Sequence, residues 1–266
     1  EFNYLKDELK VKYDFTKFIV GNSKKIEKVF ELIPKTLNSN INVLLSGETG
    51  TGKELVAKSI HYNSTYSNGK FVPINISAIP EQLLESELFG YEKGAFTGAD
   101  KTKKGKIELA HKGTLFLDEI SEMSKPLQAK LLRVLQEREV TRVGGLKTIP
   151  VDFRLISASN KDLHEQVRLN NFREDFYFRL IGFPICLPPL RERDNDVLIL
   201  AKHFAEEFSK QNKRKTPSFT VKANQKLLGH CFPGNVRELK SVVELACVLC
   251  DDFLIQPKDI SFVKNI

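Results

Sequence analysis

The sequence predicts an α/β fold, with a mostly parallel sheet sandwiched by helices, followed by a small helical domain. Apolar runs with the length of buried strands alternate with helical stretches as far as Pro188, and this order is typical of a parallel sheet with helices on both faces. Beyond Pro188-Pro189 the pattern is helical only and no strand pattern returns. Ligands on such sheets bind at the carboxyl ends of the strands, which is where the polar motifs of this chain fall.

Short runs rich in β-branched and aromatic residues are predicted as strands at residues 41–45, 71–76, 114–117, 153–157 and 183–187. One helix between them is clear. Ser124 can cap it, Pro126 lies in its first turn, and leucines recur at helical spacing at positions 127, 131, 132 and 135.

The domain boundaries follow from these patterns. We expect residues 18–190 to form the α/β domain and residues 191–266 to form a helical lid, with residues 1–17 as a linker remnant. In the lid, one helix has an apolar face and a second runs over residues 236–249 after the turn Pro233-Gly234-Asn235. The apolar face of the first helix comprises Val197, Leu200, Ala201, Phe204 and Phe208. The chain begins with Glu1 rather than Met, which indicates an excised fragment.

Composition excludes several classes of protein. Hydrophobic residues make up 41% and charged residues 28% of the 266 residues, as in ordinary globular domains. No apolar stretch approaches the ~20 residues that span a bilayer, and no leader opens the chain, so we expect no membrane contact and a cytoplasmic location. The four cysteines indicate a reducing compartment. Cys247 and Cys250 lie in an apolar helical run without a second pair, so buried thiols are favoured over zinc.

The net charge of +7 is compatible with nucleic acid binding. However, Lys and Arg are spread along the chain, and the densest clusters, residues 101–106 and 213–215, lie in loop-like segments. We therefore do not expect this fragment to bind DNA by itself.

A glycine-rich segment after the first predicted strand has the spacing of a phosphate-binding loop, whose backbone N–H groups wrap a triphosphate. It reads Gly47-Glu48-Thr49-Gly50-Thr51-Gly52-Lys53-Glu54. Lys53 is expected to reach the β and γ phosphates. The alternative is a glycine-rich turn without a ligand. Glu54 stands where a metal-binding Ser or Thr is usual, which leaves the magnesium coordination open.

The third predicted strand ends in two carboxylates, Asp118 and Glu119. We expect Asp118 to hold Mg²⁺, directly or through water, and Glu119 to polarise the attacking water as general base. The alternative is a strand that ends in acidic surface residues.

A hexapeptide lies between the phosphate loop and the strand that ends in carboxylates: Gly94-Ala95-Phe96-Thr97-Gly98-Ala99. Alone it could be a surface turn, but residues 87–93, Glu-Leu-Phe-Gly-Tyr-Glu-Lys, precede it. In this context it resembles the loop with which NtrC-type bacterial enhancer-binding proteins, a branch of the AAA+ ATPases, grip the sigma-54 form of RNA polymerase. The resemblance extends from about Phe18 to Ile260. Its terminal glycines permit a loop that lifts and folds back, with Phe96 and Thr97 as an exposed tip.

The resemblance implies a P-loop AAA+ fold and roles for two asparagines. Asn160 closes the fourth predicted strand and is similar to the family's sensor I, which would contact the γ-phosphate or the water. Asn75 ends the second predicted strand and matches the switch asparagine that holds the catalytic glutamate away, although Ile76 replaces the cysteine often found beside it. An asparagine after a strand is otherwise a turn or cap residue.

The resemblance also implies roles for three arginines. Arg173 and Arg179 lie where the family carries its arginine fingers, which stabilise phosphoryl-transfer charge in a neighbouring subunit. Their alternative is pairing with Glu174, Asp175 or Glu165. Arg237 resembles the family's sensor II, the residue through which the lid senses the nucleotide bound to its own subunit. Residues 18–21, including Ile19 and Val20, resemble the segment that cups adenine, so ATP is implied over GTP.

The function implied is an ATP-driven remodeller that requires ATP and Mg²⁺. A homo-oligomeric ring, expected to be a hexamer, would hydrolyse ATP at its interfaces and move the loops at residues 94–99 against sigma-54 in its RNA polymerase holoenzyme, driving open-complex formation. DNA binding would belong to a C-terminal domain that this sequence does not contain. Two alternatives stay open: an AAA+ nucleic-acid motor, although residues 94–99 contain no Lys or Arg, and a non-hydrolysing scaffold, which Glu119 and both arginines argue against.

Overall fold

The structure is a computed structural model that describes residues 20–262. The predicted linker at residues 1–17 and the predicted adenine contact Ile19 lie outside the described residues. The described chain divides into two compact units. The sheet unit comprises residues 32–46 and 53–186, and the helical unit comprises residues 20–31, 47–52 and 187–262. The phosphate loop, Gly47–Gly52, thus groups with the helical unit.

The sheet unit contains a five-stranded parallel sheet, ordered β2-β5-β8-β1-β9. Its strands are β1 (Val43–Ser46), β2 (Phe71–Asn75), β5 (Thr114–Asp118), β8 (Arg154–Ser159) and β9 (Phe183–Cys186), so all five predicted strands are confirmed. The central strands β5 and β8 are buried along almost their whole length, which explains why they read as continuous apolar runs rather than as alternating ones. Asn75 pairs with Asp118 in the register, so polar residues gather at the carboxyl edge.

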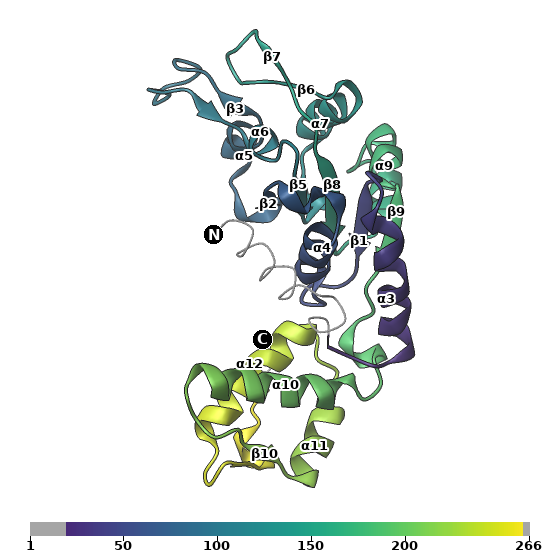
Figure 1. Cartoon of the computed structure of the whole chain (residues 1–266), viewed down its shortest axis with the longest axis vertical. Helices are drawn as coiled ribbons and strands as arrows, with labels where there is room; N and C mark the ends of the chain where they lie inside the picture. The colour runs from purple at the N-terminus through teal and green to yellow at the C-terminus, as the bar shows by residue number, and fades with distance from the viewer. Residues whose placement is uncertain (1–19, 263–266) are drawn as a thin grey trace. The chain divides into compact units, whose positions relative to one another are not determined.

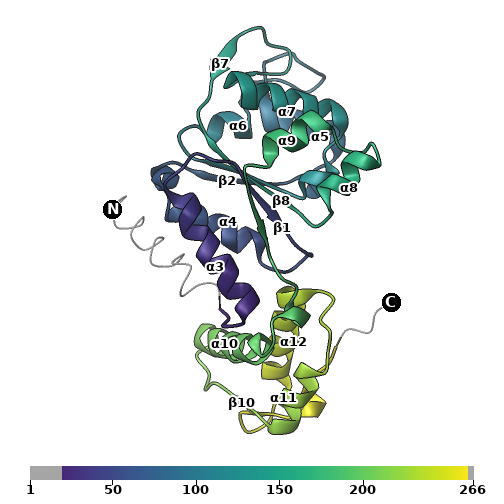
Figure 2. The same cartoon turned by 90° about the vertical axis from the view of Figure 1, so that its right-hand side faces the viewer.

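Helices cover both faces of this sheet, as expected for parallel strands. Figure 2 shows α5 (Glu81–Phe89), α7 (Lys125–Glu137) and α9 (Glu174–Leu180) on one face and α4 (Lys53–Tyr62) on the other. The remaining helices between residues 20 and 187 are α3 (Lys24–Leu37), α6 (Lys106–Leu109) and α8 (Leu163–Arg168). The 3-10 turns are η1 (Thr65–Asn68), η2 (Ile76–Ala78) and η3 (Ile120–Glu122).

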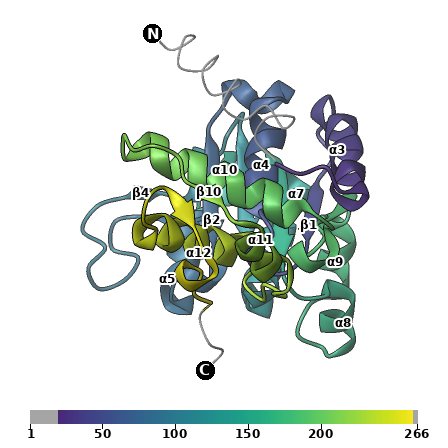
Figure 3. The ribbon, with the colours of Figure 1, turned by 90° about the horizontal axis from the view of Figure 1, so that it is seen from below.

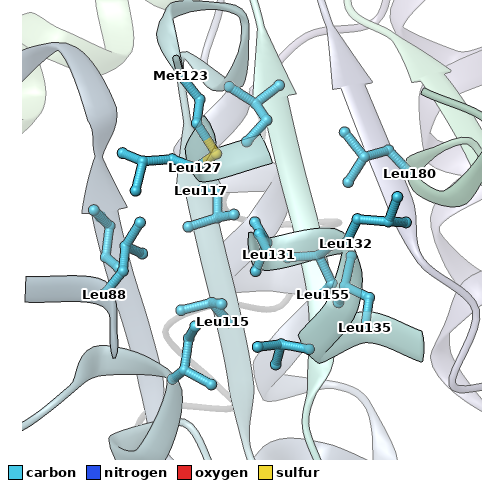
Figure 4. Packing of buried hydrophobic residues seen from close by; sticks show 14 of the residues in the cluster. Leu88, Leu115, Leu117, Met123, Leu127, Leu131, Leu132, Leu135, Leu155 and Leu180 are labelled. Carbon is cyan, nitrogen blue, oxygen red and sulfur yellow. The ribbon is translucent and has the colours of Figure 1, made fainter. Parts of the chain in front are cut away.

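The main core of the sheet unit lies between α7 and the inner face of the sheet (Figure 4). Leu131 and Leu135 of α7 are fully buried beside Leu115 and Leu155 of the central strands. This confirms the helical spacing of the α7 leucines. The prediction that Ser124 caps this helix was wrong in one respect. Ser124 is the N-cap residue, but its side chain makes no capping hydrogen bond, and Pro126 supports the helix start instead.

Two small antiparallel hairpins accompany the sheet (Figure 1). One pairs β3 (Gly90–Tyr91) with β4 (Lys103–Lys104), and the other pairs β6 (Glu139–Thr141) with β7 (Thr148–Pro150). The loop between β3 and β4 contains residues 94–99. Part of the basic cluster at residues 101–106 is therefore strand and helix rather than loop, because Lys103 and Lys104 form β4 and Lys106 begins α6.

The helical unit is built around α10 (Asp196–Gln211), which packs on α12 (Asn235–Leu249) and on α11 (Val221–Leu228), as Figure 3 shows from below. Of the predicted apolar face of α10, Phe208 is half-buried and the other members are buried. Two further turns are η4 (Leu190–Glu192) and η5 (Pro257–Asp259).

Sequence reasoning missed α11 and a short parallel strand pair in this unit. The expectation that no strand follows Pro188 was wrong, because β10 (Ser218–Phe219) pairs with β11 (Leu254–Ile255). Two residues are too few for a periodic signal. Cys247 is buried on α12 and Cys250 follows the helix end; burial raises the Cys247 pKa to about 11. Within residues 20–262 no group of three or more His, Cys, Asp or Glu side chains is placed to hold a metal ion, and no helix has the length and apolar character needed to cross a membrane.

Candidate functional site

The strand-end carboxylates of the sheet unit form the chemical centre of the candidate site. Asp118 ends β5, and its Oδ1 accepts a hydrogen bond of 3.0 Å from the Glu119 backbone N–H. Glu119 has a left-handed backbone conformation, with φ 53° and ψ 48°, which is uncommon for residues other than glycine and concentrates at functional sites. This turn projects the Glu119 side chain from the end of the sheet.

The environment of Glu119 suits a general base. Its Oε2 is buried and has no hydrogen-bond partner in the described part of the chain. Burial raises the pKa of the carboxyl above its ordinary 4.5, and Asp118 and Glu122 act in the same direction. Lys53 and a hydrogen bond from the Asn160 backbone N–H oppose the rise. The carboxylate is therefore more basic than an exposed glutamate.

The predicted asparagines lie at the same edge of the sheet. Asn160 directly follows β8 and reaches Glu119 through its backbone N–H. Asn75 ends β2, but its Oδ1 accepts from the Ala78 N–H at 3.2 Å and from Ser77 Oγ at 2.7 Å. Among the described residues no hydrogen bond joins Asn75 to Glu119, so the proposed switch contact is not made in this structure. Both roles stay predictions.

The predicted arginine fingers are exposed at opposite ends of α9. The Arg173 guanidinium pairs with Asp175 through two hydrogen bonds of 3.0 and 2.7 Å, which was one of the alternatives. Both side chains are more than two-fifths exposed, at 42% and 49%, so the pair contributes little to stability and can open. Arg179 Nη2 donates to the Leu135 carbonyl at 2.8 Å. Neither arrangement tests the finger roles.

Lys53 begins α4 directly after the phosphate loop and is only 6% exposed. Its charge lowers the Glu119 pKa, so the ammonium group lies close to that carboxylate. Glu54, the next residue, instead pairs with Lys58 one turn further along the helix at 2.8 Å. Asp118 and Glu119 bring carboxylate oxygens to the end of β5, and carboxylate oxygens are ligands that Mg²⁺ prefers. The residues present fit this metal.

The phosphate loop is held within the helical unit. Gly50 has φ 82°, and a Cβ there would lie 2.2 Å from the Gly234 carbonyl oxygen, so only glycine fits this close approach. Asn235 Nδ2 donates to the Thr49 carbonyl at 3.0 Å, and the Val236 N–H donates to the Gly50 carbonyl at 3.0 Å. The turn predicted at Pro233-Gly234-Asn235 thus binds the loop.

Arg237, the predicted sensor II residue, lies in the first turn of α12, two residues after Asn235, and is exposed. Val20, the described part of the predicted adenine segment, is half-buried, and its carbonyl accepts a hydrogen bond of 2.9 Å from Arg193. Arg193 is in turn paired with the fully buried Asp196 at 2.9 Å, which fixes the backbone around Val20.

The hexapeptide forms a closed loop in the sheet unit. The Gly94 N–H donates to the Ala99 carbonyl at 2.9 Å, and the Ala99 N–H donates to the Phe96 carbonyl at 3.0 Å. Gly94 and Gly98 have φ of 85° and 95° and nothing within 4 Å of a Cβ position. Phe96 is 44% exposed and Thr97 is exposed, in agreement with the expected tip, whereas Ala99 is buried. Ala99 therefore closes the loop rather than contributing to its surface.

Sequence reasoning missed the second hairpin, which lies against this loop. Arg142, after β6, donates to Glu92 at 2.8 Å and pairs with Glu108 at 2.9 and 2.7 Å. The bond from Thr102 and then that from Arg142 lower the pKa of Glu92, and the bonds to Glu108 and Glu92 raise the pKa of Arg142. A Cβ on Gly144 would lie 2.7 Å from the Ala95 Cβ. The Gly144-Gly145 pair between two short strands was the available signal for this hairpin.

Comparisons with known proteins find relatives along almost the whole chain. A family model described as the Sigma-54 interaction domain matches residues 19–186, and one described as the AAA+ ATPase lid domain matches residues 191–263. The chain is 51% identical over 237 residues to the nitrogen fixation protein AnfA of Azotobacter vinelandii, covering 89% of this chain and 44% of AnfA. It is 48% identical over 242 residues to the regulatory protein AtoC of Escherichia coli strain K12, covering 91% and 52%.

Among solved structures, NtrX from Brucella abortus in complex with ATP aligns with a TM-score of 0.85 at 34% identity. The alignment covers 91% of this chain and 54% of NtrX. The chain spans about half the length of the relatives it matches, whose covered shares are 44% and 52%.

Proposed function

The chain belongs to the family of sigma-54 interaction domains, and from this premise we propose that it hydrolyses ATP to remodel the sigma-54 form of RNA polymerase. The observation that carries the hydrolytic part is the state of Glu119. It combines a buried oxygen without a hydrogen-bond partner, a raised pKa and a neighbouring lysine at the carboxyl edge of the sheet.

The proposed division of labour follows from what each group can do. The loop N–H groups and Lys53 bind the phosphates, because a glycine-rich loop ahead of a helix N-terminus favours anions. Glu119 accepts the proton of the attacking water, and a hydrogen bond from the Asn160 N–H holds its carboxylate in position. Mg²⁺, when bound, would supply positive charge to the phosphate oxygens, and Asp118 would hold it.

The proposed partner contact is the tip of the loop at residues 94–99. Phe96 offers an apolar ring and Thr97 a hydroxyl, and both are exposed. The pairing of this loop with the β6–β7 hairpin supports its movement as part of a larger element. A ring of six copies, in which Arg173 and Arg179 complete a neighbouring site, is the assembly we propose. Because RNA polymerase is the proposed target, the cytoplasm is the proposed location.

The experiment that tests this function separates the loop from the hydrolysis site. Thr97→Ala and Phe96→Ala should keep ATPase activity within about threefold of wild type, since a change below ~1 kcal/mol is expected away from the reacting groups. Both variants should lose open-complex formation with sigma-54 polymerase. Leu83→Ala, which truncates an exposed side chain on α5, is the matched control and should lose neither activity. Retained activation by both loop variants would identify a different target.

A further inference from the structure

The Glu48 carboxylate of the phosphate loop is committed to protein contacts. Arg191 of η4 donates to it from Nη1 at 2.7 Å and from Nη2 at 2.6 Å, in a two-point pairing. Asn235 Nδ2 adds a third hydrogen bond at 3.1 Å. The bonds from Arg191 have the largest effect and the bond from Asn235 the next, and together they lower the Glu48 pKa to about 2. The carboxylate therefore carries a full negative charge at neutral pH.

A negative charge in this loop is unfavourable for its proposed ligand. A phosphate loop binds anions because its N–H groups converge, and a carboxylate within the loop would repel the phosphates unless a cation neutralised it. The Arg191 guanidinium supplies that cation. The pairing thereby removes an electrostatic penalty from the binding site.

Asn235 and two other donors of the helical unit also orient the loop backbone. Three successive carbonyls are turned toward protein donors: that of Glu48 toward Thr51 Oγ1 at 2.8 Å, that of Thr49 toward Asn235, and that of Gly50 toward the Val236 N–H. Carbonyl oxygens engaged in this way cannot face an anion.

Asn235 joins the two halves of the arrangement. It is fully buried, and its Oδ1 accepts a hydrogen bond of 2.8 Å from the Leu190 N–H at the start of η4, the turn that carries Arg191. One side chain therefore contacts Glu48, Thr49 and the backbone of Leu190, the residue before Arg191. All of these residues belong to the helical unit.

We propose that Glu48, Arg191 and Asn235 form a loop clamp, in which Arg191 and Asn235 are positioning residues that neutralise Glu48 and orient the phosphate loop for nucleotide. Arg191 in this arrangement acts on the carboxylate and does not contact phosphate. The inference rests on the proposed nucleotide binding and deepens it. It assigns to the Glu48 side chain a structural role, distinct from that of a phosphate ligand.

The test is a double-mutant cycle on nucleotide affinity, measured by equilibrium titration with a fluorescent ADP analogue and competition by ATP. Arg191→Ala should weaken binding by about fivefold to tenfold, because the unpaired Glu48 carboxylate then repels the phosphates and salt screens only part of that repulsion. Glu48→Gln should weaken it less, because no unpaired anion remains. The double variant should bind more tightly than Arg191→Ala alone, a rescue that a residue in contact with phosphate would not permit.

Salt dependence and a matched control complete the design. The defect of Arg191→Ala should shrink as ionic strength rises, because screening weakens the repulsion from Glu48. Lys25→Ala removes another exposed cation of the helical unit, paired with Glu192 at 2.7 Å, and should bind nucleotide like the wild type. Arg191 and Glu48 are 43% and 41% exposed, so their variants should fold, which melting curves will check.

The outcomes separate the clamp from the proposed function. Wild-type affinity in Arg191→Ala, an equal loss in Lys25→Ala, or a double variant no better than Arg191→Ala would overturn the clamp while nucleotide binding stands. Binding by the wild type without hydrolysis would overturn the proposed ATPase activity and leave the clamp supported by its rescue. Absence of nucleotide binding by the wild type would overturn both.

Discussion

At the scale of single residues, the site depends on side chains whose surroundings differ sharply over short stretches of sequence. Glu119, next to Asp118 at the end of β5, has a raised pKa and a buried oxygen without a hydrogen-bond partner among the described residues. Glu48, a third carboxylate, has its pKa lowered to about 2 by Arg191 and Asn235. Burial and hydrogen bonding therefore assign different chemistry to identical functional groups.

Binding and hydrolysis should be lost separately. Lys53→Ala should remove ATP binding, because it deletes the buried ammonium group that follows the loop. Glu119→Gln should keep binding and lose hydrolysis, because the amide cannot accept the proton of water. Equilibrium binding and phosphate release, measured side by side, check both. Tight ATP binding by the lysine variant or wild-type turnover by the glutamine variant would remove the assigned role.

The raised pKa of Glu119 predicts the acid side of the pH profile. A protonated Glu119 cannot act as a base, so kcat/KM should fall as pH decreases through its folded-state pKa. Since burial raises that pKa and Lys53 only partly opposes the rise, the acid limb should lie above pH 4.5, the ordinary value for glutamate. Phosphate release measured across pH, with folding monitored at each point, tests this prediction. An acid limb at or below 4.5 would contradict it.

At the scale of elements, the loop at residues 94–99 and the β6–β7 hairpin act as one piece. The Glu92 and Val143 backbones are linked by a hydrogen bond of 3.0 Å, and Arg142 adds bonds to Glu92 and Glu108. Short hairpins are marginally stable alone, so the pairing of the two supplies the order that neither has by itself.

Removing the arginine should therefore loosen the loop. The Glu108 side chain is only 7% exposed, and Arg142→Ala removes the cation that pairs with it. An unpaired buried carboxylate destabilises the fold. We expect faster amide hydrogen exchange at residues 90–99 with little change in β5 and β8. Arg133→Ala, which breaks the exposed pair with Glu137 on α7, is the control and should leave exchange in the loop unchanged. Equal exchange in Arg142→Ala and wild type would show that the backbone contacts suffice.

At the scale of the whole molecule, the arginines of α9 give the strongest reason to expect assembly. Arg173 and Arg179 are exposed, and their guanidinium groups contact Asp175 and the Leu135 carbonyl, respectively. If they complete a neighbouring copy's site, an isolated copy is nearly inactive. Specific ATPase activity should then rise with protein concentration.

A mixture of two inactive variants is the stricter test. Glu119→Gln lacks the base but keeps its arginines, and Arg173→Ala keeps the base but lacks one arginine. At an interface where the first variant lends Arg173 to the second, both groups are present, and an arginine finger can be worth about 10³-fold or more in rate. The mixture should hydrolyse ATP well above the sum of its parts. If mixed rings form and stay inactive, Arg173 does not complete the site of a neighbouring subunit. Repeating the mixture with Arg179→Ala then tests whether Arg179 has that role.

The sequence by itself determined the five parallel strands, the buried leucines of α7 and the identities of the strand-end carboxylates, because burial and helical periodicity leave direct patterns in the order of residues. It also determined the exposed tip of the loop, since flanking glycines and polar neighbours are local signals. Only the tertiary structure decided the strand order, the partnership of Arg142 with Glu92 and Glu108, and the clamp of Glu48 by Arg191 and Asn235. Glu48 and Arg191 are 143 positions apart. No local spacing encodes such a contact, because it exists only once the phosphate loop has packed beside the start of α12.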